Sequence, residues 1–442
     1  MAAVMDAADA KPRRKIGFWM CTALVVGNVI GMGIFVLPAS MAPYGLNALL
    51  GWGATLVGCL ALARIFAHLA KAMPEADGPY VYMRYAFGEI PAFIALWAYW
   101  AAIWPTDAAF VTGVVGYLGA VFPATTAISP VVLALALLWS VVLINLFGVR
   151  TGGAVQVVTT VLKLVPMVAV AVLGAWVLIH SPSDYVAHVP TTPISMHAVM
   201  GASALALFAM IGIESAAMPA ARVDNPGRTI PRATMIGTGL VVLIYLVVST
   251  VPLLLVKQGD LATSSAPLSL LMEQLMGPGY ARWLGLFVVI SGLGALNGWT
   301  LLVGEITRTM AEHGVMPKML GRSNRFGSPA AALIVIGLCA SAMVLMSYSK
   351  SLVGAFTFFT RLVTASNLPL YSGCVLAFFI LWRRGKVPLR ARSVLPVVVI
   401  GLLYVVMAFI GAGTEATLLM FALCAAGLPL YAYVKWRAKQ ER

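Results

Sequence analysis

The amino-acid sequence predicts an all-α polytopic membrane protein with twelve transmembrane helices. Hydrophobic residues make up 61% of the 442 residues and charged residues only 10%, whereas a soluble domain carries about a quarter of charged residues. The apolar residues gather in runs that are long enough to cross a bilayer as helices. Two of these runs are interrupted near their middle by glycine and polar residues. The composition therefore predicts a membrane protein, and the interruptions indicate a site inside it.

The apolar runs define the expected spans, with boundaries good to a few residues. They cover 17–42, 46–70, 87–121, 128–148, 152–180, 197–219, 233–256, 281–310, 329–347, 351–382, 393–412 and 416–434. If each half of the chain holds five spans, the interrupted runs are spans 1 and 6, at corresponding positions. We then expect an N-tail, two five-helix units, a pair of accessory helices and a C-tail, at 1–16, 17–180, 197–382, 393–434 and 435–442.

The placement of the basic residues explains the net charge of +14. With the N-terminus inside, nearly all Lys and Arg residues lie in or beside segments expected in the cytoplasm. The exceptions are Lys257, Arg282 and Lys350 outside, and Lys163 and Arg361 within spans. An excess of basic residues on cytoplasmic segments is usual in membrane proteins. The charge thus fits a chain with both termini in the cytoplasm, and it gives no reason to expect a nucleic-acid partner. We expect the protein in a bacterial-type inner membrane.

Span 1 contains the first interruption, Gly27-Asn28-Val29-Ile30-Gly31-Met32-Gly33. Glycine lowers helix propensity and lets a ligand approach the backbone closely. Unwound backbone at membrane depth is tolerated only where it lines a cavity or is buried in protein. Close helix packing would account for two of the glycines, but not for four flexible or polar residues in seven. We therefore expect a substrate site here.

Span 6 contains the second interruption, Ala209-Met210-Ile211-Gly212-Ile213-Glu214-Ser215, with a carboxylate where lipid would be. Two discontinuous helices at corresponding places in two halves are the best sequence indication of a transporter's central site. A transporter is therefore the first hypothesis.

Three ionisable residues lie deep within spans, where a charge is costly and usually functional. Asp107 in span 3 is a candidate site residue, with a structural ion pair to an intramembrane cation as the alternative. Lys163 in span 5 fits a proton carrier, a fixed cation in place of sodium, or a tether between helices. Arg361 in span 10 needs a carboxylate or carbonyl partner, which the sequence does not identify.

Aromatic residues add two further candidates. Trp299 in span 8 lies between small residues, so its face is suited to a cation or an alkyl chain, although packing alone also accounts for it. Tyr99 in span 3 either lines the path or belongs to an interfacial belt. At the end of span 8, Glu305 and Arg308 are three residues apart and are expected to form a surface ion pair.

The remaining reactive residues do not indicate an enzyme. The five cysteines lie in apolar spans without metal-ligand spacing, and the five histidines lie near span ends or in loops. A catalytic set or metal cluster within the spans is therefore missing, and we expect neither a cofactor nor a metal. A channel is disfavoured because the sequence has no filter motif or repeated polar face.

These motifs together resemble the amino acid/polyamine/organocation transporters, and within them the arginine/agmatine and related basic amino acid antiporters. The resemblance rests on residues 27–39 of span 1, on Ile211-Gly212-Ile213-Glu214-Ser215 with the following Asn225-Pro226 and Pro231, and on Gly298-Trp299-Thr300-Leu301-Leu302 of span 8. It implies the leucine-transporter fold, with inverted five-helix repeats, broken helices 1 and 6, and alternating access.

The resemblance also implies roles for single residues. The unwound parts of spans 1 and 6 would hold the α-carboxylate and α-amino groups of the substrate, and Trp299 would stack on it. Glu214 would link protonation to gating, and Tyr99 and Tyr371 would act as gates. The matching residues for the backbone sites are Asn28, Val29, Ile30, Gly31, Met32, Gly33, Ala209, Ile211 and Gly212.

Three positions depart from the arginine/agmatine antiporters. Phe208 stands where they have a capping tryptophan, Asp107 where they have asparagine, and Lys163 is similar to a lysine that other branches place at the sodium position. Asp107 favours a cationic substrate, whereas Lys163 favours general exchangers or proton-coupled permeases. The leading hypothesis is exchange of a basic amino acid for its decarboxylated amine, and the alternative is a permease for neutral amino acids. The sequence leaves open whether the protein forms a homodimer.

Overall fold

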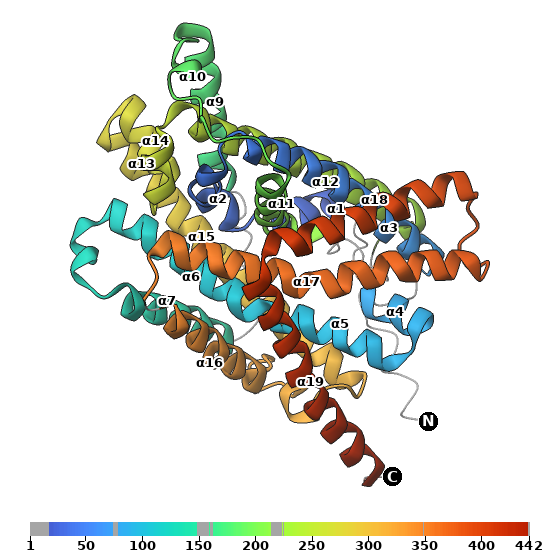
Figure 1. Cartoon of the computed structure of the whole chain (residues 1–442). Helices are drawn as coiled ribbons and strands as arrows, with labels where there is room; N and C mark the ends of the chain where they lie inside the picture. Colours follow the sequence, from blue (N-terminus) through green and yellow to red (C-terminus); the bar gives the residue numbers. More distant parts are fainter. Residues whose placement is uncertain are drawn as a thin grey trace.

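The computed structural model describes residues 17–73, 78–147, 159, 162–213, 223, 225–347 and 349–440, and the regular structure within these ranges is helical (Figure 1). Six of the described helices are long and apolar enough to cross a membrane. They are α3 (Asn47–Ala72), α12 (Pro226–Leu255), α15 (Pro278–Glu312), α17 (Leu352–Arg383), α18 (Ala391–Ala412) and α19 (Thr414–Gln440). The expectation of an all-α membrane protein with several spans is thereby confirmed.

Shorter apolar helices occupy most of the other expected runs. They are α1 (Phe18–Val29), α2 (Gly33–Met41), α7 (Pro130–Leu146), α9 (Leu164–His180), α11 (Met196–Met210) and α16 (Ala330–Met346). Short 3-10 turns follow or separate some of them, namely η1 (Ala42–Tyr44), η2 (Pro123–Ala127) and η5 (Lys318–Gly321).

The first apolar run is two helices, because the backbone leaves the helical conformation after Val29. Ile30 is extended, with φ −73° and ψ 96°, and α2 begins only at Gly33. Gly31 lies between them under the ring of Phe110, and a Cβ atom at this position would lie 2.7 Å from the Cζ atom of that ring. The glycine therefore allows the aromatic ring to cover the interruption.

The second interrupted run begins in the same way. Helix α11 ends at Met210, Ile211 is extended, and Gly212 has φ +110°, a conformation that favours glycine. Residues 214–222 lie outside the described part of the chain, and Glu214 is among them.

Span 3 differs from the single run that the sequence predicts. The structure has α5 (Glu89–Ala101) and α6 (Ile103–Val121), separated at Ala102. Pro105 explains the separation, because it cannot donate the backbone hydrogen bond that would continue the helix. Before α5, helix α4 (Pro79–Phe87) occupies the second half of a segment expected to be a loop, and Gly88 with φ +90° joins the two helices.

The helices enclose α11, whose residues 201–210 are all buried. Helix α11 packs against α3, α17 and α18, while α1 packs along α12 and α6 along both α15 and α17. The short helices α10 (Asp184–Ala187), α13 (Gln258–Thr263) and α14 (Pro267–Met276) gather at one end of the bundle, whereas α4 lies at the other (Figure 1). We call these the α13 end and the α4 end.

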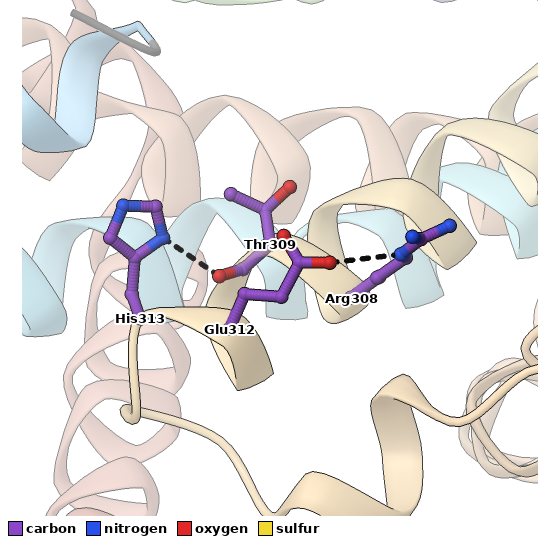
Figure 2. Close-up of polar contacts among 4 residues, drawn as sticks. All are labelled: Arg308, Thr309, Glu312 and His313. Carbon is purple, nitrogen blue, oxygen red and sulfur yellow. Dashed lines mark hydrogen bonds and ion pairs between the residues drawn. The ribbon is translucent and has the colours of Figure 1, made fainter. Parts of the chain in front are cut away.

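Helix α15 finishes at the α4 end, where its last turn carries polar contacts (Figure 2). Arg308 pairs with Glu312 at 3.0 Å, and both partners are exposed. A separation of four residues places the two side chains on the same face of the helix. The side chain of Glu305 lies outside the described part of the chain. His313 Nδ1 lies 2.8 Å from the carbonyl oxygen of Thr309.

Candidate functional site

A pocket lies where the broken helix α1–α2 meets α6, α11, α12, α15 and α17. It is nearly closed in this conformation, because the space open to the centre of a water molecule is about 10 Å³, enough for about one water. The lining residues are Val29, Gly31, Gly33, Thr106, Phe110, Phe208, Ala209, Ile211, Tyr245, Trp299 and Val363. Both interrupted segments therefore contribute to one site.

Backbone groups at the interruptions supply the polar part of the pocket. The first turn of α2 begins at Gly33, and the first N–H groups of a helix have no partner within it. Such a terminus favours an anion, whereas the carbonyl groups at the end of α1 and α11 favour a cation. The Tyr245 hydroxyl, from α12, donates to the Val29 carbonyl at 2.9 Å. The arrangement suits a molecule with both a carboxylate and an ammonium group.

Aromatic rings form the walls of the pocket. The ring of Phe110 contacts Phe208 and Trp299 edge-on, with centroids 6.2 and 6.4 Å away. Phe208 in turn contacts Phe356 at 5.9 Å. Together with Trp299, these phenylalanines enclose the site in apolar surface that is also suited to cations.

Asp107 lies on α6 next to the pocket residue Thr106, although it is not itself a lining residue. Its side chain is 1% exposed, and the Oδ1 atom has no hydrogen-bond partner. Among the described residues no Lys or Arg forms an ion pair with it, so the structural pairing considered from the sequence is not found there. A buried carboxylate oxygen without a partner is costly.

Lys163 is buried behind the interruption, just before α9. Its ammonium group donates to the Gly27 carbonyl, in the last turn of α1, at 3.4 Å. Thr159, from the same segment, packs against Gly294 of α15. A Cβ atom at Gly294 would lie 2.1 Å from the Oγ1 atom of Thr159. The segment that carries Lys163 therefore contacts both α1 and α15.

The other predicted site residues lie around the pocket or outside the described chain. Of the residues predicted to bind the substrate, Ile30, Met32 and Gly212 do not line it, and Met32 turns towards Gly113 and Gly292. The side chain of Asn28 and all of Glu214 lie outside the described part.

The two predicted gating tyrosines are also buried away from the pocket lining. Tyr99 is in α5 and is 2% exposed. Tyr371, in α17, places its ring edge-on to Phe66 of α3 at 5.9 Å. Neither tyrosine contributes to the pocket wall in this conformation.

Four lining residues were not predicted from the sequence: Thr106, Phe110, Tyr245 and Val363. Thr106 and Phe110 lie close to Asp107 in the sequence of α6. This closeness to a predicted site residue is the feature that could have identified them. Tyr245 is a single hydroxyl in an apolar run of α12, and Val363 resembles any core residue.

Comparison with known proteins supports a transporter. The amino acid permease family model matches residues 16–425. The chain is 31% identical over 376 residues to the cadaverine/lysine antiporter of Escherichia coli (strain K12), covering 82% of this chain and 83% of that protein. It is 29% identical over 428 residues to the putrescine transporter PotE of the same strain, covering 96% and 97%. The corresponding Haemophilus influenzae protein is 28% identical over 427 residues.

The family and these relatives are transporters and not enzymes, as expected from the sequence, and they confirm the resemblance stated there. The family match agrees with the pocket at the broken helices and with the apolar helices, since all three indicate a membrane transporter. The chain belongs to the amino acid permease family, within the amino acid/polyamine/organocation superfamily, and is a transporter.

Proposed function

We propose that this transporter is an antiporter that exchanges a basic amino acid for its decarboxylated amine. The observation that carries the proposal is Asp107, a buried carboxylate with a free oxygen next to the pocket. An intramembrane carboxylate is costly unless it serves a cation. Lysine, cadaverine and putrescine appear in the names of the relatives. These three compounds and ornithine are therefore the first substrates to test. The arginine/agmatine pair is a further candidate.

The pocket suggests a pose for the substrate. Its α-carboxylate would meet the N-terminus of α2, and its α-ammonium would meet the carbonyl groups at the ends of α1 and α11. The cationic side chain would then extend between Trp299 and Asp107. A diamine would use the carbonyl groups and Asp107, but would leave the α2 terminus without an anion.

The rest of the mechanism follows from the family resemblance. Twelve spans, in two inverted five-helix repeats followed by two accessory helices, would alternate access to the pocket across a bacterial inner membrane. Both termini would lie in the cytoplasm, so the α13 end would face outward. Lys163 would hold the end of α1 in place of sodium, and Tyr99 and Tyr371 would close the path.

Glu214 is proposed to link protonation to gating. The Glu214→Gln change is therefore expected to flatten the pH dependence of exchange while the protein stays folded. An unchanged pH profile would remove this residue from the mechanism.

Exchange in liposomes tests the proposed function. The purified protein is reconstituted into vesicles preloaded with unlabelled lysine, and uptake of labelled lysine is measured against empty vesicles. Competitors are cadaverine, putrescine, ornithine, arginine, agmatine, alanine and leucine. We expect uptake that needs internal substrate and is inhibited by the cations only. Inhibition by alanine and leucine would refute the proposal.

A permease for neutral amino acids is the second candidate, because most of the pocket wall is apolar. Val29, Ile211 and Val363 line it beside the aromatic rings, and such surfaces accept an aliphatic side chain. In this case Asp107 would have a structural role and would not discriminate between substrates.

A further inference from the structure

A larger cavity, with about 530 Å³ open to water, lies at the α13 end. It is bounded by α2, η1, α13, the start of α17 and the turn between α18 and α19. We call it the Arg361 cavity. The polar side chains that matter in its lining are Ser40, Tyr44, Lys350, Thr357, Arg361 and Glu415.

Arg361 is a partly buried cation whose guanidinium group has few hydrogen-bond or ion-pair partners. One of its guanidinium nitrogens donates to the Tyr44 hydroxyl. Its Nε atom is buried and has no hydrogen-bond partner. Within the described ranges no carboxylate pairs with it. A guanidinium group has five N–H donors in a planar fork that matches a carboxylate, so most of this recognition capacity is unused.

The other charges of the cavity do not cancel that of Arg361. The Lys350 ammonium lies over the ring of Phe358, 5.1 Å from its centroid. Glu415 is the acidic residue in the lining, and it is exposed in the first turn of α19. The hydroxyl groups of Thr357 and Ser40 bond to each other at 2.8 Å. Two cations and one anion therefore give the cavity a positive balance.

The cavity lies beside the pocket on the way to the α13 end. Helix α2 contributes Gly33 to the pocket and Ser40 to the cavity, and seven helical residues correspond to about 10 Å. Helix α17 contributes Val363 to the pocket and Arg361 to the cavity. A substrate that reaches the pocket from this end would pass Arg361.

We propose that the Arg361 cavity binds the carboxylate of an amino acid that approaches the pocket and disfavours a diamine. The inference rests on the proposed exchange and adds a step of selection at one face. A basic amino acid offers a carboxylate and one net positive charge, whereas a diamine offers two positive charges and no carboxylate. Because like charges repel, the cavity favours entry of the amino acid and departure of the diamine.

Chemical modification tests this binding without relying on transport. Phenylglyoxal modifies arginine side chains, and mass spectrometry of peptides gives the rate at Arg361 in the intact protein. The rate is compared without additive and with lysine, alanine, lysinamide or cadaverine. We expect lysine and alanine to slow it about threefold or more, and lysinamide and cadaverine to leave it unchanged. Arg282, exposed near the start of α15 and outside the cavity, is the control.

Equal rates under all conditions, or equal protection by lysinamide and cadaverine, would overturn the inference. Protection by alanine as well as lysine is expected even if the transported substrate is neutral. A failure of the proposed function therefore leaves this readout unaffected, and the two failures are distinguishable.

Transport from each face gives the second readout. In intact cells and everted vesicles, Arg361→Gln is expected to raise the KM for lysine about fivefold at the α13 face only, and to lower or preserve the KM for cadaverine. Arg361→Lys should retain part of the preference, and Lys257→Gln, outside the cavity at the same end, should change nothing. An equal change for both substrates or at both faces would contradict the assignment.

Discussion

The ammonium group of Lys163 lies 3.4 Å from the carbonyl oxygen of Gly27, so a buried cation meets the last turn of α1 beside the substrate pocket. A hydrogen bond to a charged group contributes about 1.5–3 kcal/mol. We therefore expect Lys163→Met to reduce the exchange rate about tenfold or more, measured with labelled lysine in preloaded vesicles. Lys257→Met, an exposed lysine at the α13 end, is the control. Exchange at the wild-type rate would show that this contact is dispensable.

The same contact leads to a prediction about sodium. If Lys163 replaces a bound sodium ion at the end of α1, exchange should be equal in sodium and choline buffers. The measurement is the initial rate of lysine exchange at matched ionic strength. A rate that rises with sodium would indicate an ion site that Lys163 does not fill.

The helix interruptions could be predicted from the sequence, because several glycine and polar residues rarely cluster within an apolar run unless the helix is broken there. The residues that line the pocket could not all be predicted from the sequence. Phe110 and Tyr245 are ordinary in their own helices, and they become pocket residues only because α6 and α12 pack against the interruption. Likewise, the separation of α5 from α6 depends on one missing N–H group at Pro105, which does not alter the hydropathy of the run.

Charged residues within the membrane were recognised individually, but their partners were not. The sequence predicted that Arg361 needs a carboxylate or a carbonyl group, and the structure gives it the Tyr44 hydroxyl instead. Such pairings depend on contacts between segments that are 317 residues apart, and local patterns carry no information about them.

Gly31 provides a steric test of the pocket. A Cβ atom there would lie 2.7 Å from the Phe110 Cζ atom, so Gly31→Ala should displace the ring and raise the KM for exchange about tenfold, since overpacking typically costs about 1–3 kcal/mol. Adding Phe110→Leu should restore part of the affinity by removing the clash. Gly53→Ala on α3 has no atom within 4 Å of the new Cβ atom and is the matched control. No effect of Gly31→Ala would show that the ring does not define the site.

Tyr245 tests the polar side of the pocket. Its hydroxyl donates to the Val29 carbonyl oxygen at 2.9 Å, and such a bond contributes about 1 kcal/mol. Tyr245→Phe should therefore raise the KM about fivefold with little loss of thermal stability, followed by exchange kinetics and a melting curve in detergent. Tyr185→Phe removes a comparable bond, to the Gly174 carbonyl at 2.7 Å, away from the pocket. Equal kinetic effects of the two changes would argue against a special role for Tyr245.

Asp107 separates the two proposed substrate classes. Asp107→Asn keeps the size of the side chain but removes its charge, so the KM for lysine and cadaverine should rise about tenfold or more because an opposite charge in the site is lost. Leucine, which is not expected to inhibit the wild-type protein, should inhibit the variant equally little or more. Asp184→Asn, on the exposed helix α10, serves as the control. An unchanged preference for cations would assign Asp107 a structural role and favour the neutral permease.

Coupled movement of two labelled substrates tests the central claim most directly. Vesicles that contain the protein and one labelled diamine, cadaverine, are placed in lysine that carries a different label, and both fluxes are recorded over time. We predict that lysine entry and cadaverine exit are equal and that neither occurs when the opposite substrate is omitted. Lysine uptake into empty vesicles driven by a proton gradient, with no diamine leaving, would contradict the account.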